Sequence, residues 1–199
     1  NGTSVSLSSD GSRVAIGATG NDVNGSGSGH VRIYDYNGSA WLQVGADIDG
    51  EAAGDGSGHS VSLSSDGSIV AIGATNNDAG NSNSDNRGHV RIYQYSGGSW
   101  TKLGSDIDGE YAGDYFGSSV SLSSDGSIVA IGAINNDAGG TNRGHVRVYE
   151  YSSSSWTQVG GDIDGENNYD NFGLSLSISS DGTKFAAGAP YFGDNLGRV

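Results

Sequence analysis

The residues best able to do chemistry in this chain are carboxylates that recur in one short pattern. Asp47, Asp49, Glu51 and Asp55 occupy positions 1, 3, 5 and 9 of a glycine-bearing segment. Carboxylates at this spacing can converge on a hard cation, because calcium accepts several oxygen ligands at flexible angles. Calcium is therefore a possible cofactor. The other two copies of the pattern add Asp106, Asp108, Glu110, Asp114, Asp162, Asp164, Glu166 and Asp170.

The same segments also fit a turn without a metal. In this interpretation an isoleucine such as Ile48 ends a strand, and the Asp and Gly residues form the turn to the next unit. The threefold recurrence favours a structural purpose for either interpretation, since a catalytic site is normally assembled once.

Three further sets of residues recur, and each has a binding and a structural interpretation. The Asn-Asp loops could hold calcium or sugar hydroxyls, but Asn and Asp more often cap loops. One His per repeat does not supply the roughly four close ligands of zinc, so we expect each His to form a hydrogen bond with the neighbouring repeat. One Trp per repeat could stack on a sugar, but packing between sheets is favoured. These residues are Asn21-Asp22, Asn76-Asn77-Asp78, Asn135-Asn136-Asp137, His30, His89, His145, Trp41, Trp100 and Trp156.

The sequence offers no signature of catalysis. It contains neither a G-x-S-x-G nucleophile elbow with its partners nor a phosphate-binding P-loop. We therefore expect a protein that is not an enzyme.

Composition bounds the partners and the location of the chain. The net charge of −14 repels nucleic acid and anionic membrane surfaces, and no apolar stretch is long enough to cross a bilayer. The 199 residues contain no Met, as expected for a mature product or a piece of a longer protein. Three possible glycosylation sequons, at Asn1, Asn24 and Asn37, fit an extracellular or cell-surface glycoprotein.

An internal repeat organises the whole chain. The segment Ser-Val-Ser-Leu-Ser-Ser-Asp-Gly begins at Ser4 and returns at Ser60, Ser119 and, slightly altered, Ser175. One repeat region, 1–199, is predicted, with repeats at 4–59, 60–118 and 119–174 and a partial repeat at 175–199. The longer second copy places its extra residues in an Asn-rich stretch at 76–87, which is predicted to be a loop.

Each repeat predicts four strands. Alternating Val5 and Leu7 mark the first, a Ser-Asp-Gly turn leads to the second at 14–18, the third follows at 31–36, and the fourth runs from Trp41 to Ile48. Four antiparallel strands with small residues on the inner pair fit a blade of a β-propeller. A β-solenoid or a sandwich of similar hairpins is the alternative.

The repeats resemble the FG-GAP repeats of integrin-type propellers. Phe116-Gly117 and Phe172-Gly173 precede the first strand, and Gly188-Ala189-Pro190 follows the second. The resemblance implies an all-β propeller of four-stranded antiparallel blades, about 3.5 of them here, that serves adhesion or ligand recognition. The calcium loop that the family often carries between the first two strands is not carried over, because here that connection is only Ser-Ser-Asp-Gly. This short turn also resembles WD40 repeats, the second choice.

Three and a half blades leave a ring open, with unpaired sheet edges. We therefore expect the partners to be other protein chains or the remaining blades of a longer protein. The expected function is a structural or adhesive module, with a carbohydrate-binding propeller as the alternative and glycans as its partners.

Overall fold

The protein is described by a computed structural model that covers residues 2–78 and 85–199. The middle of the predicted Asn-rich loop, residues 79–84, lies outside the described residues. The first sheet contains β1 (Ser4–Leu7), β2 (Arg13–Ala18), β3 (His30–Tyr36), β4 (Trp41–Gln43) and β5 (Ile48–Asp49). The second contains β6 (Ser60–Leu63), β7 (Ile69–Ala74), β8 (His89–Ser96), β9 (Ser99–Lys102) and β10 (Ile107–Asp108).

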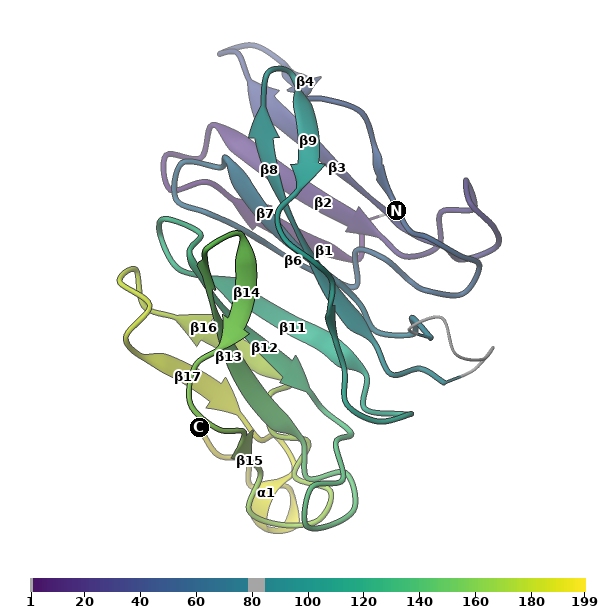
Figure 1. Ribbon diagram of the computed structural model, residues 1–199, viewed down its shortest axis with the longest axis vertical. Coiled ribbons are helices and arrows are strands. Elements are labelled where there is room, and N and C mark those ends of the chain that lie inside the picture. The colour runs from purple at the N-terminus through teal and green to yellow at the C-terminus, as the bar shows by residue number, and fades with distance from the viewer. Residues whose placement is uncertain (1, 79–84) are drawn as a thin grey trace.

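The third sheet and the C-terminal hairpin continue this pattern. The third sheet contains β11 (Phe116–Leu122), β12 (Ile128–Ala133), β13 (His145–Ser152), β14 (Ser155–Gln158) and β15 (Ile163–Asp164). The hairpin is β16 (Ser175–Ile178) with β17 (Phe185–Gly188), and one short helix, α1 (Phe192–Asn195), follows. All strand pairs are antiparallel, and the sheets follow one another from the purple N-terminal sheet to the yellow hairpin (Figure 1). Sequence repeats and sheets coincide, except that β11 begins at Phe116, ahead of the predicted boundary at 119.

The turn between the first two strands of each sheet is built by its own side chains. Asp10 Oδ1 accepts hydrogen bonds from Ser8 Oγ at 2.7 Å and from the Ser12 amide at 2.9 Å, and Gly11 takes a positive φ of 70°. The Ser12 amide is the main reason that the pKa of Asp10 falls to about 2. The same turn recurs in the other repeats, so its Asp has a defined structural role.

The fourth strand differs from the prediction. It does not run unbroken from Trp41 to Ile48 but is divided into β4 and β5, which both pair with β3. The interruption lies at Gly45, whose φ is +73°. The Trp100 indole of the next repeat packs there, and a Cβ on Gly45 would lie 2.8 Å from its Cδ1. Contact between repeats therefore requires a glycine at this position, but it does not cause the break, because the fourth strand of the third repeat is divided in the same way at Gly160, where a Cβ would meet no described atom within 4 Å.

The apolar cores lie between successive sheets rather than within one. Val31 and Ile33 of the first sheet pack against Val61, Leu63 and their neighbours in the second. A second core joins the second and third sheets, and a third joins the third sheet to the hairpin. Face-to-face packing of four-stranded sheets around such cores is the arrangement of propeller blades.

Hydrogen bonds also connect neighbouring repeats along their inner strands. The amide of Ser9 donates to the carbonyl of Ser65, and Ser65 donates in the same way to Ser124. Backbones approach closely beside these strands: a Cβ on Gly73 would lie 2.1 Å from the carbonyl oxygen of Gly117. The glycine near the end of the second strand and the glycine of the Phe-Gly motif in the next repeat therefore meet across the junction.

The described residues include no helix with the length and apolarity that crossing a bilayer requires.

Candidate functional site

The third and fifth strands of the first sheet bring four polar side chains onto one face. In their register His30 lies opposite Asp49. Because successive side chains of a strand alternate between its faces, Arg32 and Asp47 share the face of His30. Val31 emerges on the other face and is fully buried in the core between sheets. The alternation of apolar and polar residues in the sequence therefore separates the core from a polar cluster.

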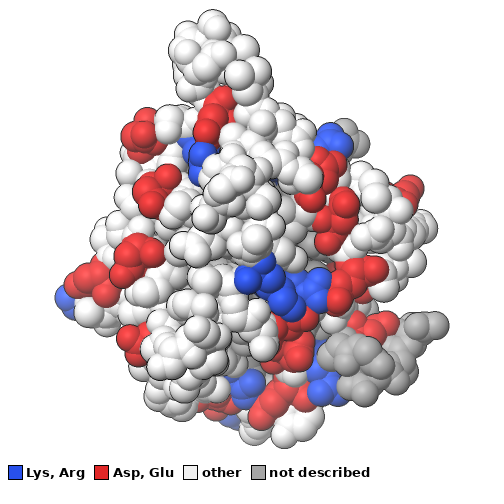
Figure 2. All heavy atoms as spheres, turned by 45° about the horizontal axis from the view of Figure 1, so that its top comes forward, with Lys and Arg blue, Asp and Glu red and all other residues white. Residues whose placement is uncertain are grey.

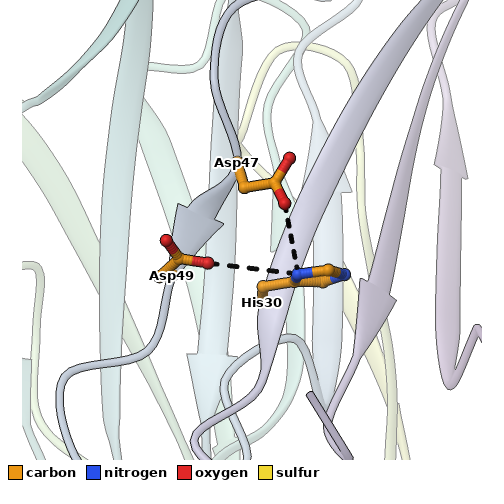
Figure 3. A group of neighbouring side chains, drawn as sticks. All are labelled: His30, Asp47 and Asp49. Carbon is orange, nitrogen blue, oxygen red and sulfur yellow. Dashed lines mark ion pairs between the residues drawn. The ribbon is translucent and has the colours of Figure 1, made fainter. Parts of the chain in front are cut away.

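Two carboxylates lie beside the imidazole of His30. Its Nδ1 is 3.5 Å from Asp47 Oδ2 and 4.0 Å from Asp49 Oδ1, and both carboxylates point toward it (Figure 3). Asp47 is already engaged, because Arg32 donates to its Oδ2 at 2.8 Å and Gln43 donates to its Oδ1 at 2.6 Å. The first of the candidate calcium ligands is therefore also one half of an ion pair.

The second and third sheets repeat this cluster and add a carboxylate from the preceding repeat. Arg91 pairs with Asp106 at 2.7 Å and also with Glu51 of the first repeat. Arg147 similarly joins Asp162, at 2.6 Å, to Glu110 of the second repeat. The guanidinium group thus bridges two repeats at each of these junctions.

The ion pairs shift the pKa values of their members. Burial alone would raise the pKa of Asp106, but the hydrogen bonds from Arg91 and Lys102 lower it to about 2. Burial by itself lowers the pKa of Arg91, but the hydrogen bonds with Asp106 and Glu51 outweigh this effect, so the pKa of Arg91 is raised overall. Both groups stay charged near neutral pH, so the junction remains an ion pair.

The histidines behave differently from the prediction. Burial lowers the pKa of His89 and of His145 to about 4, and the neighbouring arginine adds to this shift, so both imidazoles are neutral at pH 7. Neither ring nitrogen of His145 has a hydrogen-bond partner, and Nδ1 of His30 has none. The predicted hydrogen bond between blades is therefore wrong for His145, and an arginine connects the repeats instead.

The four candidate calcium ligands of each repeat occupy different surroundings. The carboxylate at position 1 pairs with an arginine of its own sheet, and the one at position 3 lies opposite a histidine in the strand register. The carboxylate at position 5 forms an ion pair with an arginine of the next repeat. Position 9 belongs to the loop: Asp55 accepts from the Ala52 amide and from Asn77, and Asp114 accepts from Tyr111 and Asn136. In the third repeat Glu166 pairs with Arg198 at 2.6 Å, and Asp170 accepts from the Asn167 amide.

Some of these carboxylates lie together with a histidine, within one repeat in the first sheet and across a repeat boundary in the second and third. Among the described residues three groups have potential ligand atoms within 4.8 Å of one another: His30, Asp47 and Asp49; Glu51, His89 and Asp106; and Glu110, His145 and Asp162. The loop carboxylates Asp55, Asp114 and Asp170 belong to none of them. Calcium binding by the twelve predicted residues stays a prediction.

The sequons and the Trp residues can also be placed. Asn24 and Asn37 are exposed, whereas Asn1 lies outside the described residues. Trp100 Nε1 donates to the carbonyl of Val44 at 2.9 Å, and Trp156 donates in the same way to the preceding repeat, so both pack between sheets as predicted. Trp41 is exposed.

The arginine and glutamate of the junctions were not singled out as a pair from the sequence. A signal for them existed, because both recur once per repeat, as Arg91 and Arg147 and as Glu51 and Glu110. Their pairing needs the face-to-face stacking of sheets, which places residues about 40 positions apart side by side. Figure 2 shows one face of the molecule, where basic side chains lie next to acidic ones.

Comparison with known proteins agrees with this architecture. Residues 106–149, which span β10 to the middle of β13, match the FG-GAP repeat family. The chain is similar in structure to a protein assigned as a 6-phosphogluconolactonase from Bacteroides uniformis, with 11% identity and a TM-score of 0.59 over 98% of this chain and 52% of that one. It is also similar to a protein assigned as TolB from Agrobacterium tumefaciens, with 15% identity and a TM-score of 0.52 over 96% of this chain and 54% of that one.

These findings confirm the resemblance to FG-GAP repeats and the predicted all-β propeller fold. The chain spans about half the length of both structures, and at such identities the likeness concerns the fold alone. No protein of curated function matches the chain in sequence.

Proposed function

We propose that this chain is a non-catalytic structural module of an extracellular or cell-surface protein, and that the outer face of its first sheet docks a further repeat unit of the same type. The observation that carries the proposal is a difference in exposure between equivalent residues. Val5 and Leu7 of the first sheet are 70% and 58% exposed, whereas Val61 and Leu63 at the same positions of the second are 8% and 7% exposed. The first sheet thus presents the face that the other sheets bury against a preceding repeat.

Polar groups on this face define what fits it. At the other junctions the Trp donates to a backbone carbonyl of the preceding repeat, and the Arg donates to a Glu of that repeat as its second ion-pair partner. On the first sheet Trp41 is exposed, and among the described residues Arg32 pairs with Asp47 of its own sheet. A unit that offers a carbonyl, a glutamate and an apolar sheet face would satisfy all three groups.

The size of the contact supports a stable arrangement. Full burial of an aliphatic side chain stabilises by about 1.5–3 kcal/mol, so covering the exposed parts of Val5 and Leu7 alone contributes roughly 2–4 kcal/mol before the entropy of association is subtracted. Such a unit could come from a longer chain or from a second chain, and both sources offer the same chemistry.

The test is the mass of the particle in solution, with a variant on the proposed face. Sedimentation of the 199-residue chain over a range of concentrations will show association, which Leu7→Asp will abolish and Leu174→Asp, at an exposed position elsewhere, will not. If the chain is a monomer throughout, an extended chain with a duplicate of residues 60–118 placed ahead of residue 4 must melt at a higher temperature. A monomer whose extension brings no stabilisation contradicts the proposal.

The absence of catalysis and the surface location belong to the same proposal. The polar clusters recur in each repeat, and their charges are largely paired with one another. Such repeated ion pairs favour a structural role in packing over a catalytic role. FG-GAP repeats are typical of extracellular proteins, and the exposed sequons at Asn24 and Asn37 fit that route. Glycosylation is checked by a mass shift on glycosidase treatment of the protein from its natural source.

A carbohydrate-binding propeller remains the second candidate because of Trp41. Its ring lies 5.2 Å from that of Tyr36, and both side chains are exposed, which makes an aromatic surface of the kind that stacks on sugars. A glycan array separates the two functions. Binding that is lost in Trp41→Ala would favour a lectin, and an array without any signal would remove this candidate.

A further inference from the structure

The polar cluster of the first sheet contains two buried atoms whose hydrogen-bonding capacity is unused. Among the described residues Nδ1 of His30 and Oδ1 of Asp49 have no hydrogen-bond partner, and the His30 side chain is more than nine-tenths buried. Buried polar atoms without partners are rare, and each costs about 1–3 kcal/mol. Two of them face each other across 4.0 Å, with a third oxygen, Asp47 Oδ2, 3.5 Å from the imidazole nitrogen (Figure 3).

We propose that His30 Nδ1, Asp47 Oδ2 and Asp49 Oδ1 form a site for one divalent transition-metal ion of the zinc type. Zinc binds imidazole nitrogen and carboxylate oxygen at about 2.0–2.2 Å, so ligand atoms around a tetrahedral ion lie roughly 3.3–3.5 Å apart. The two distances from Nδ1 are close to this range, and small side-chain rotations close the difference. One neutral imidazole with two carboxylates is also a donor set that zinc prefers to calcium, whose ligands are oxygens.

The surroundings of the arginine distinguish this cluster from the equivalent ones. The side chains of Asp47 and Asp49 are 24% and 29% exposed, so an ion can reach them from solvent. In the other clusters the arginine is enclosed: the Arg91 and Arg147 side chains are 13% and 8% exposed, and each is held by two carboxylates.

The arginine of the first cluster can give way to an incoming cation. The Arg32 side chain is 43% exposed and has Asp47 as its partner among the described residues. It can therefore move toward solvent when a cation enters, and the ion would supply positive charge to Asp49, which pairs with no arginine among the described residues. In the 199-residue chain the first cluster is thus the one in which a metal does not compete with an enclosed guanidinium group, and a docked unit, which would bring a glutamate to Arg32, would compete with the metal for this face.

The test is titration of the 199-residue protein, freed of metal by EDTA, with zinc chloride in a calorimeter. We expect one ion per chain, and we expect His30→Gln and Asp49→Asn each to weaken binding about tenfold or more. His59→Gln, at an exposed histidine outside the cluster, is the matched control and should leave the affinity unchanged. Unfolding midpoints measured without metal show whether each variant is folded.

Two further readouts make the result decisive. Cobalt(II) in place of zinc should give the intense visible absorption of a tetrahedral site, and this absorption should vanish in His30→Gln. Absence of zinc binding, or binding that persists in His30→Gln, overturns the proposal. Calcium that binds in place of zinc and persists in His30→Gln also overturns it, because the carboxylates would then act without the imidazole.

Discussion

The packing of one repeat against the next can be tested with a single atom pair. Trp100 donates its indole N–H to the carbonyl of Val44, a buried residue of the preceding repeat. Trp100→Phe removes the donor and leaves the carbonyl without a partner, which costs about 1–3 kcal/mol. The smaller ring also leaves part of the space beside Gly45 unfilled.

Trp41 provides a matched control in the same chain. It has the same position in its repeat and stacks on an equivalent tyrosine, Tyr36, but it is exposed. Exposed substitutions usually change stability by less than about 0.5 kcal/mol, so Trp41→Phe should leave it nearly unchanged. The expected difference between the two variants is roughly 2 kcal/mol.

Urea unfolding and thermal melting both measure this difference. In a domain of this size about 1 kcal/mol shifts the melting temperature by roughly 2–4 °C, so Trp100→Phe should melt about 4–8 °C below Trp41→Phe. Equal losses in the two variants would refute the reasoning, because the indole would then contribute through its own sheet and not through the junction. Addition of a preceding repeat should make Trp41→Phe as costly as Trp100→Phe.

Three more outcomes follow from the same junctions. Gly104→Ala should cost about 1–3 kcal/mol more than Gly160→Ala in urea unfolding, since both glycines have a φ near +77° but only a Cβ at Gly104 meets the indole of the next repeat, at 2.8 Å; equal costs would show that backbone strain alone decides. Arg147→Met should cost about 2–4 kcal/mol, because it leaves two carboxylates facing each other, whereas Arg32→Met at the open face should cost less than about 1; a reversed order would disprove the bridging role. The pKa of His145 is lowered from 6.5 in the unfolded chain to about 4 in the folded one, so below pH 6.5 the unfolded chain binds a proton that the folded chain does not. The free energy of unfolding should therefore be unaffected by this group above pH 6.5 and should decrease by up to about 3 kcal/mol as the pH falls toward 4. Melting temperatures measured over this pH range should show the decrease, and His145→Gln should make it smaller.

Most of the fold could be predicted from the repeat pattern of the sequence. Alternating apolar residues such as Val5 and Leu7, followed by a Ser-Asp-Gly turn, are sufficient to predict a hairpin, because strand and turn chemistry are local. The division of the fourth strand was not predictable in this way. It lies at a glycine of positive φ that recurs as Gly45, Gly104 and Gly160, and the packing of Trp100 at Gly45 comes from another repeat, of which one repeat read alone contains no sign.

The candidate site was predicted in its residue types but not in its grouping. The carboxylates at Asp47 and Asp49 were identified as possible ligands from their spacing, which assumes that one loop gathers them. Strand pairing instead places them beside His30, and stacking of sheets sends Glu51 to the next repeat. Spacing along the chain reports proximity in a loop, whereas in a stack of sheets the partners are set by strand register and by the neighbouring sheet.

The junctions have a consequence for how such a chain can change by duplication. Trp100 and Ser60 both donate to main-chain carbonyls across a junction, those of Val44 and Gly117. A carbonyl is present whatever the side chain, so these contacts survive the exchange of Val44 for the leucine that occupies the same place in the next repeat. Units joined in this way can be gained, lost or reordered by recombination between repeats and still recognise their neighbours, with glycine at the closest approaches as the main requirement on sequence.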